Sequence, residues 1–388
     1  MKELRNIVHT FDKTDFSKLR AALATVVKAR GSSYRSPGAR MLITDDGHWV
    51  GSISGGCLEG DALRKAREVM STGKSRLITY DTMNDEENTI CIGLGCNGVI
   101  DVLIEPVDQG QHAGPINLLR ELIQFEDIGA IATVYKSTSS EVAVGERWVI
   151  GPDQSTDHQM QDNALTSSVL KDLESAKVNR QAETKEYITE EGEISIFFEI
   201  VQPSIQLLIF GAGFDVKPVV ELASTLGWHI TVTDECIAHV APIHFPKADS
   251  VIHSEREQMS QKLPCSSYTA ALLMSHGYDY DLEGLKYLIN TNARYIGILG
   301  PKKRSDKMLT ELEKDGKPLS DENLSRIHAP IGLDIGAETP EEIAMAVIAE
   351  IQAKFTNRSG GFLKHRTGPI HERKNASDQV FKALYAQS

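Results

Sequence analysis

The sequence predicts a two-part α/β protein, with a mixed α/β domain over residues 1–202 and a Rossmann-type doubly wound parallel-sheet domain over residues 203–388. Three observations predict it. The chain has 388 residues, which is longer than a domain with a single hydrophobic core usually is, so two domains are expected. Hairpin-like strand pairs occupy the first part, whereas strands alternate with helices after Pro203. A Gly-Ala-Gly turn at residues 211–213 joins the first of those strands to a helix.

Short apolar segments with β-branched residues predict the strands of the first part. Residues 40–44 and 48–53 flank an Asp-Asp-Gly turn, which predicts a hairpin, and a helix over 58–70 ends near Gly73. No internal repeat is found. We expect the polar stretch 151–191 to be a variable connection with a short helix inside it. Further strands are predicted at 21–29, 75–80, 99–104, 130–135, 142–150 and 194–201, with a helix from Pro115.

The second part alternates strands and helices, as a parallel sheet requires. Its last strong helix begins at Thr339, an N-cap residue followed by Pro340 and, at the third helical position, Glu342. The predicted strands are 205–210, 229–233, 269–274 and 295–299, and the predicted helices include 216–226 and 281–289.

Composition and charge exclude several classes of protein. Acidic residues outnumber basic ones by 54 to 41, and the net charge of -13 disfavours a binder of nucleic acid backbones. No apolar run approaches the roughly 20 residues that cross a bilayer, and the amphipathic stretches lack a basic membrane-facing side. The five cysteines are scattered, and residues 1–4 lack the apolar core of a signal peptide. We therefore expect a cytoplasmic protein without a structural metal site, membrane contact or nucleic acid partner.

The Gly-Ala-Gly turn predicts a nucleotide site. Gly211 and Gly213 follow a buried strand and open a helix, so amide groups there can face a diphosphate. Asp234 stands about 20 residues further on, where a carboxylate can bind a ribose diol. Val216, however, occupies the third glycine position of the fingerprint. NAD(P) or another nucleotide is the expected ligand. Two alternatives remain: the crevice is vestigial, or it holds a different ligand.

Two groups of cations are candidate anion contacts. Lys302, Lys303 and Arg304 follow a predicted strand at the start of a helix, where a phosphate contact and a solvated basic surface are both open. Arg35 and Arg40 bracket a Ser-Pro-Gly loop and can present a fork of donors to an anion. Exposed arginines on a loop, however, need no ligand.

Cys57 is the cysteine that we expect to carry chemistry. It follows Gly55 and Gly56 and starts a helix whose dipole favours the thiolate, which can bind or carry sulfur. The alternative is a small buried packing residue. Cys96, in a second glycine-rich loop, is a weaker candidate. His276, which follows a strand of the second part, is a candidate proton donor or a polar loop residue.

Long motifs in both parts resemble one family, the XdhC/CoxI proteins, which are accessory factors for molybdenum hydroxylases such as xanthine dehydrogenase. The first part carries GSSYRSPGARM at 31–41 and GSISGGCLE at 51–59, and the second carries APIGLDIGAETPEEI at 329–343. Two positions depart from the family pattern. Phe214 follows the Gly-Ala-Gly turn where His is usual, and Asn97 stands where the second loop usually has Gly.

The resemblance implies a chaperone rather than a turnover catalyst. Such a protein binds the molybdenum cofactor (molybdopterin), protects it while its terminal sulfur is installed, and inserts it into a molybdenum hydroxylase. The implied partners are that client enzyme and a cysteine desulfurase, and we expect a homodimer. The residues implied to lie at the cofactor are Arg35, Arg40, Ser54, Gly55, Gly56, Cys57, Glu59 and Cys96.

Two further hypotheses stay open at this point. In the first, the chain is an NAD(P)-dependent oxidoreductase that uses His276 as acid or base beside a nicotinamide. In the second, it is a scaffold that has lost its ligand and docks two enzymes. The motif at 51–59 favours the chaperone, because it has no role in an ordinary dehydrogenase.

Overall fold

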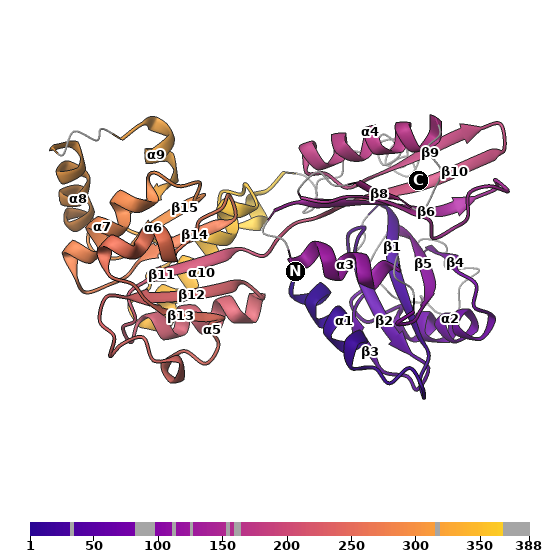
Figure 1. The fold of residues 1–388 in the computed structure, drawn as a ribbon, viewed down its shortest axis with the longest axis horizontal. Helices are drawn as coiled ribbons and strands as arrows, with labels where there is room; N and C mark the ends of the chain where they lie inside the picture. The colour runs from indigo at the N-terminus through magenta and orange to yellow at the C-terminus, as the bar shows by residue number, and fades with distance from the viewer. Residues whose placement is uncertain are drawn as a thin grey trace. The chain divides into compact units, whose positions relative to one another are not determined.

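A computed structural model describes residues 1–31, 35–81, 98–110, 114–124, 127–152, 156–158, 164–314 and 319–367. It contains two compact units, which we call the N-terminal unit (mainly Glu3–Gln202) and the C-terminal unit (mainly Pro203–Thr367). The first holds two antiparallel sheets and the second holds one parallel sheet, as Figure 1 shows. The predicted fold class is therefore confirmed. None of the described helices is both long and apolar enough to span a membrane.

The N-terminal unit contains two five-stranded sheets, with strand orders β3-β2-β1-β5-β4 and β8-β7-β6-β10-β9. The strands of the first sheet are β1 Ala21–Gly31, β2 Arg40–Thr44, β3 Trp49–Gly51, β4 Arg76–Asp81 and β5 Gly98–Val107. Those of the second are β6 Gly129–Ser137, β7 Arg147–Ile150, β8 Thr156–His158, β9 Glu183–Thr189 and β10 Gly192–Val201. The helices are α1 Lys2–Lys13, α2 Glu59–Thr72, α3 Pro115–Gln124 and α4 Ala164–Asn179.

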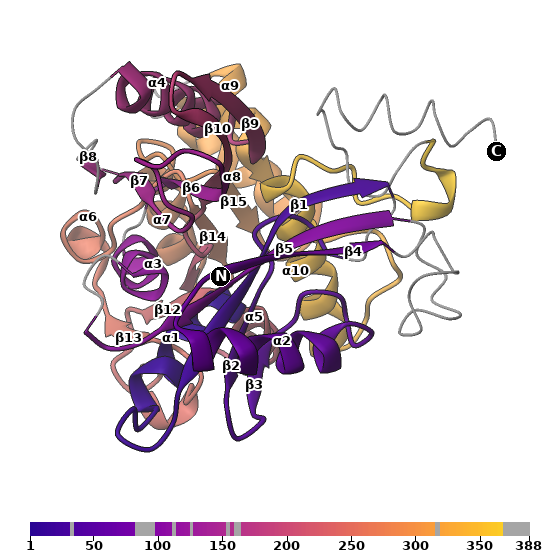
Figure 2. The ribbon, with the colours of Figure 1, turned by 90° about the vertical axis from the view of Figure 1, so that its right-hand side faces the viewer.

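Burial arranges these elements in layers. Helix α2 packs Ala62 and Ala66 on one face of the first sheet, and α4 packs Val169 and Leu173 on one face of the second. Figure 2 shows α2 running along the strands of the first sheet and α4 beside β9 and β10. The other faces of the two sheets meet through a small apolar cluster: Val27, Leu103, Tyr135 and Phe197. Helices α1 and α3 pack against these same faces in a larger cluster that joins residues of both sheets. The two sheets therefore lie between α2 and α4, with α1 and α3 against their inner faces.

The two halves of the N-terminal unit repeat one topology. The order α1-β1-β2-β3-α2-β4-β5 recurs as α3-β6-β7-β8-α4-β9-β10, with the same strand order in each sheet. A register shift interrupts β1 between Val26 and Lys28, and the matching shift interrupts the pairing of β6 with β10. The expectation that the chain has no internal repeat is wrong. The overlooked signal is ALATV at 22–26 and AIATV at 130–134.

Side-chain contacts also repeat between the halves. The Tyr80 hydroxyl lies 3.0 Å from Asp61 Oδ2, and the Tyr187 hydroxyl lies 2.7 Å from Asp172 Oδ2, so in each half a tyrosine of the outer strand bonds to an aspartate of the outer helix. The stretch 151–191, expected to be a variable connection, contains β8, α4 and β9 among its described residues. These elements are the counterparts of β3, α2 and β4.

The C-terminal unit is a six-stranded parallel sheet in the order β13-β12-β11-β14-β15-β16. Helices α5 and α10 cover one face, and α6, α7 and α8 cover the other, so the sheet is doubly wound. The strands are β11 Gln206–Phe210, β12 His229–Asp234, β13 Ser250–His253, β14 Thr269–Leu273, β15 Tyr295–Ile298 and β16 Ile327–His328. The α-helices are α5 Val216–Leu226, α6 Met259–Lys262, α7 Tyr278–Leu288, α8 Lys302–Lys314, α9 Asp321–Arg326 and α10 Pro340–Phe355.

Two features of this unit matter for a site. Helix α10 begins with the predicted capping box, in which Thr339 and Glu342 exchange hydrogen bonds of 3.3 and 2.9 Å. Strand order reverses between β11 and β14, because β12 and β13 lie on one side of β11 and the later strands on the other. In open parallel sheets, ligands bind beyond the carboxyl ends of the strands at such a reversal.

Candidate functional site

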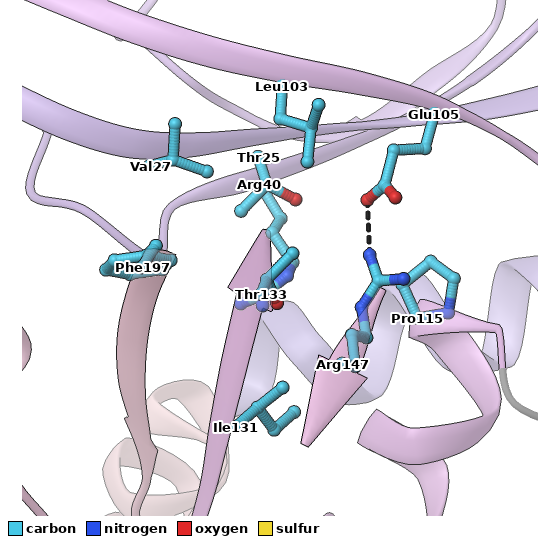
Figure 3. Close-up of a pocket in the computed structure, with 10 residues that line it drawn as sticks. All are labelled: Thr25, Val27, Arg40, Leu103, Glu105, Pro115, Ile131, Thr133, Arg147 and Phe197. Carbon is cyan, nitrogen blue, oxygen red and sulfur yellow. Dashed lines mark hydrogen bonds and ion pairs between the residues drawn. The ribbon is translucent and has the colours of Figure 1, made fainter. Parts of the chain in front are cut away.

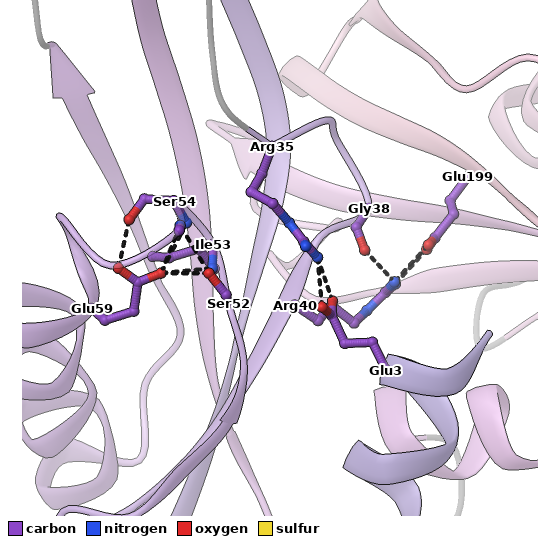
Figure 4. Close-up of polar contacts among 10 residues, drawn as sticks. Glu3, Arg35, Gly38, Arg40, Ser52, Ile53, Ser54, Glu59 and Glu199 are labelled. Atoms are coloured by element: carbon purple, nitrogen blue, oxygen red, sulfur yellow. Dashed lines mark hydrogen bonds and ion pairs between the residues drawn. The ribbon is translucent and has the colours of Figure 1, made fainter. Parts of the chain in front are cut away.

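The loop before α2 is held by a carboxylate of its own. Glu59, the first residue of α2, is 4% exposed, and its side chain turns back into the loop (Figure 4). Oε1 accepts hydrogen bonds from the amides of Ile53, Ser54 and Gly55 at 3.2, 3.0 and 3.2 Å, and Oε2 accepts from those of Gly56 and Leu58 at 2.9 and 3.1 Å. The hydroxyls of Ser52 and Ser54 donate to the same carboxylate at 2.7 and 2.5 Å.

This arrangement explains the loop's glycines. Gly55 and Gly56 have φ of 92° and 127°, which turn consecutive amides toward one point. Burial of the Glu59 carboxyl opposes its ionisation, but hydrogen bonds from the hydroxyls of Ser54 and Ser52 and from the Ser54 amide lower its pKa to about 2. The amides of this loop are therefore bonded to a carboxylate of the chain itself and are not free for an anionic ligand.

Cys57 is exposed on this loop. A side chain on the preceding residue, Gly56, would meet no atom within 4 Å, so the space beside the loop is open. The alternative that Cys57 is a buried packing residue is therefore wrong. An accessible thiol on a loop fixed by many hydrogen bonds can bind a soft metal or carry sulfur as a persulfide. Cys96, the weaker candidate, lies outside the described residues.

The two predicted arginines face carboxylates of the same unit. Two contacts of 2.6 and 2.7 Å join the Arg35 guanidinium to the carboxylate of Glu3 (Figure 4). Arg40 is 5% exposed, donates to Glu199 at 2.5 Å and also donates to the carbonyl of Gly38 at 2.9 Å. Arg40 therefore stabilises the interior of the N-terminal unit, and it is not among the residues that we propose to contact a ligand.

A second buried pair mirrors the first. Arg147, at the start of β7, donates to Glu105 of β5 at 2.5 Å (Figure 3), just as Arg40 of β2 donates to Glu199 of β10. Each pair joins one sheet to the other. The cavity between them measures about 10 Å³, room for one water molecule at most. It is lined by Thr25, Val27, Arg40, Leu103, Glu105, Pro115, Ile131, Thr133, Arg147 and Phe197, and we assign it to the core.

The C-terminal unit has a crevice of about 210 Å³ at the carboxyl edge of its sheet. Its lining residues follow β11, β14 and β15, so it lies at the reversal of strand order. Two of our candidates, His276 and Arg304, are among them, whereas Lys302 and Lys303 are exposed on α8 and are not. The lining residues are Asp215, Met274, Ser275, His276, Leu299, Gly300 and Arg304.

The Gly-Ala-Gly turn borders this crevice. A Cβ on Gly211 would lie 2.7 Å from the backbone of Met274, so only glycine lets the turns after β11 and β14 approach so closely. A Cβ on Gly213 would lie 2.8 Å from Asp215 Oδ1 and 3.2 Å from His276 Nε2. The carboxylate and the imidazole therefore flank one side of Gly213.

Asp234 holds the same turn from the neighbouring strand. Its two carboxylate oxygens accept hydrogen bonds from the amides of Ala212 and Cys236 at 3.0 and 2.8 Å, and the residue is 8% exposed. The residue predicted to bind a ribose diol thus already has two backbone partners.

A buried ion pair fixes the far wall of the crevice. Arg304 donates to the carbonyls of Leu299 and Ser275 at 3.2 and 3.4 Å and pairs with Asp281 at 2.9 Å. Asp281 is fully buried, and this burial raises the pKa of its carboxyl to about 6, although contacts with Ser275 and Arg304 act in the opposite direction.

This shift predicts a pH effect on stability. Because the pKa of Asp281 rises from 3.8 to about 6 on folding, its favourable contribution is complete below the unfolded value and is lost as pH rises through the folded value. Between about pH 4 and pH 7, the free energy of unfolding of wild type should fall by about 2–3 kcal/mol relative to Asp281→Asn. Urea titrations at each pH measure it. Asp279→Asn, an exposed neighbour on α7, is the control, and equal pH profiles for wild type and Asp281→Asn would contradict the expectation.

Known proteins resemble this chain over most of its length. A family model described as the XdhC Rossmann domain matches residues 207–351, and one described as the XdhC and CoxI family matches residues 17–81. A relative from Bacillus subtilis (strain 168), described as a probable subunit of xanthine dehydrogenase, is 32% identical over 332 residues, which cover 85% of this chain and 92% of that protein.

Two further matches agree with these. The molybdenum cofactor insertion chaperone PaoD of Escherichia coli (strain K12) is 24% identical over 332 residues, or 85% of this chain and 82% of that protein. A solved structure described as a xanthine dehydrogenase from Bacillus halodurans aligns with a TM-score of 0.74 and 30% identity, over 92% of this chain and 97% of its own.

Proposed function

This chain belongs to the XdhC and CoxI family, and from that premise we propose that it binds the molybdenum cofactor and inserts it into a molybdenum hydroxylase of the xanthine dehydrogenase type. The name of the relative PaoD, a molybdenum cofactor insertion chaperone, supports this role. The proposal includes support for sulfuration of the cofactor, with a cysteine desulfurase as the sulfur source. It also includes a homodimer in the cytoplasm.

The observation that carries the proposal is the exposed Cys57 on a loop fixed by the Glu59 carboxylate. The second half of the N-terminal unit repeats the fold, yet the first turn of α4 contains no acidic residue. Among the described residues of the two halves, the carboxylate that binds the loop before the outer helix therefore belongs to the first half. Its presence in the first half supports a role in presenting Cys57 to a ligand, because a site works best on a preorganised loop.

Cofactor retention tests the role of Cys57. Purified protein is mixed with molybdenum cofactor, and the molybdenum and pterin that co-elute in gel filtration are measured. Wild type should retain about one cofactor per chain, and Cys57→Ala should retain about tenfold less, because the sulfur contact is lost. Cys236→Ala, at another exposed cysteine, is the control and should behave as wild type. Failure of the wild type to retain any pterin would refute the proposal.

An NAD(P)-dependent oxidoreductase is the second candidate, and the position of His276 in the crevice of the C-terminal unit favours it. Its test is hydride transfer to NAD or NADP with a panel of alcohols and aldehydes. Turnover that is lost in His276→Ala, without loss of folding, would promote this candidate over the chaperone.

A further inference from the structure

We propose that the crevice of the C-terminal unit binds the aminopyrimidinone ring of a pterin through Asp215, and that it excludes a dinucleotide. The inference rests on the proposed function, since it names the crevice of the C-terminal unit as the site that binds the pterin part of the molybdenum cofactor. It differs from the nucleotide that the Gly-Ala-Gly turn led us to expect.

Charge at the start of α5 opposes a diphosphate. In folds that bind dinucleotides, free amides of the first helical turn face the diphosphate. Here the amides of Val216 and Lys217 bond to the carbonyls of Gly213 and Phe214, each at 3.3 Å. The side chain of Asp215, the N-cap residue, places a carboxylate at the same end. That carboxylate makes no capping hydrogen bond, and its negative charge repels a phosphate.

The size of the crevice also opposes a dinucleotide. Pockets for drug-sized ligands measure about 300 Å³ or more, whereas this crevice measures about 210 Å³. Val216, at the third glycine position of the fingerprint, is fully buried, so its side chain occupies space that a glycine would leave free. A single ring system therefore fits the space better than two nucleosides do.

Asp215 lacks a donor that a ligand would supply. Its Oδ1 atom is buried and has no hydrogen-bond partner within the part of the chain that the structure describes. Buried acceptors are nearly always paired, so an unpaired one at the edge of a crevice points to a missing donor. An aminopyrimidinone ring presents a ring N–H and an amino N–H side by side, a match for two carboxylate oxygens.

Residues near Asp215 supply the other hydrogen-bonding group that an aminopyrimidinone ring needs. His276 lies on the same side of Gly213 as the Asp215 carboxylate, so its imidazole can donate to the carbonyl oxygen of the same ring. The turn that carries His276 is held in place, because Ser275 bonds to Asp281 through its amide and to Arg304 through its carbonyl. The donor and acceptor positions are therefore set before a ligand arrives.

A titration of the full chain with 6-hydroxymethylpterin, followed by pterin fluorescence, tests the inference. Wild type should bind with a dissociation constant in the micromolar range, and Asp215→Asn should bind at least tenfold more weakly. Asp306→Asn, an exposed carboxylate on α8, is the control and should bind as wild type. Thermal unfolding of each variant shows that a loss of binding is not a loss of folding.

Two other ligands, GMP and NAD, test whether the crevice prefers a pterin over a nucleotide. GMP carries a similar ring edge on a purine, and NAD carries the diphosphate. Binding of GMP but not of the pterin overturns the assignment to a pterin, and NAD binding that Asp215→Asn leaves unchanged or strengthens overturns the exclusion of dinucleotides. Pterin binding equal in wild type and Asp215→Asn overturns the role of Asp215.

Cofactor retention separates this inference from the proposed function. If wild type and Asp215→Asn retain the molybdenum cofactor equally and neither binds free pterin, the inference fails and the proposed function stands. If wild type retains no cofactor but binds pterin through Asp215, the chaperone role fails and the crevice assignment stands.

Discussion

Replacing Arg147 by methionine is expected to lower the free energy of unfolding of the N-terminal unit by about 3–5 kcal/mol. Glu105 is 4% exposed, and the substitution would leave its carboxylate buried without the guanidinium that pairs with it. Urea denaturation, followed by the fluorescence of the buried Trp148, measures the change.

The internal repeat supplies matched controls for this prediction. Arg40→Met should cost a similar amount, because Arg40 and Glu199 form the equivalent pair. Arg64→Met should cost less than about 1 kcal/mol, because the guanidinium of Arg64 is mostly exposed. Adding Glu105→Leu to Arg147→Met should recover most of the loss. A cost below about 1 kcal/mol for Arg147→Met would show that the pair is not needed to join the sheets.

Replacing Glu59 by alanine is expected to release the Cys57 loop, with a loss of about 2–4 kcal/mol in the stability of the N-terminal unit. The side chain accepts hydrogen bonds from five amides and two hydroxyls, and each hydrogen bond to a charged group contributes about 1.5–3 kcal/mol without being additive. Cofactor retention should fall as far as in Cys57→Ala, because the thiol loses its fixed position. Denaturation and gel filtration measure the two effects.

Because the Glu59 carboxyl is ionised when it binds the loop, its contribution to stability should depend on pH. Folding lowers the pKa of Glu59 from 4.5 to about 2, so its stabilisation is present above the unfolded value and is lost as pH falls from 4.5 towards 2. Over that window, wild type should lose about 2–3 kcal/mol relative to Glu59→Gln. Glu68→Gln, on the exposed side of the same helix, is the control. If Glu59→Ala leaves stability and retention unchanged, the loop does not depend on its carboxylate.

The repeat separates what builds the N-terminal unit from what was added to it. Both halves keep the interior Arg–Glu pair, the Tyr–Asp contact with the outer helix and a glycine of positive φ before the arginine, Gly38 and Gly145. The carboxylate-held loop with an exposed thiol is described in the first half. The two halves thus share their scaffold, and the features proposed for function belong to one of them.

Local patterns in the sequence determined most elements of the fold. Alternation of β-branched residues, the Gly-Ala-Gly turn after a buried strand and the Thr339 capping box depend on neighbours in the chain, and the structure has each of them. The repeat was missed because its signal is spread over short, separate matches, such as 22–26 with 130–134 and the Gly-x-Arg segments at 38–40 and 145–147.

The candidate site shows where such local reasoning stops. Sequence patterns alone selected the loop at 51–59, the turn at 211–213 and the family to which the chain belongs. Only the tertiary structure decided which polar groups meet. Glu59 binds its own loop, Arg40 pairs with Glu199 on a distant strand, and Asp215 Oδ1 has no donor among the residues that the structure describes. The type of a residue limits which groups its side chain can bind. Which of those groups it contacts depends on its rotamer and on packing between residues that are far apart in the sequence.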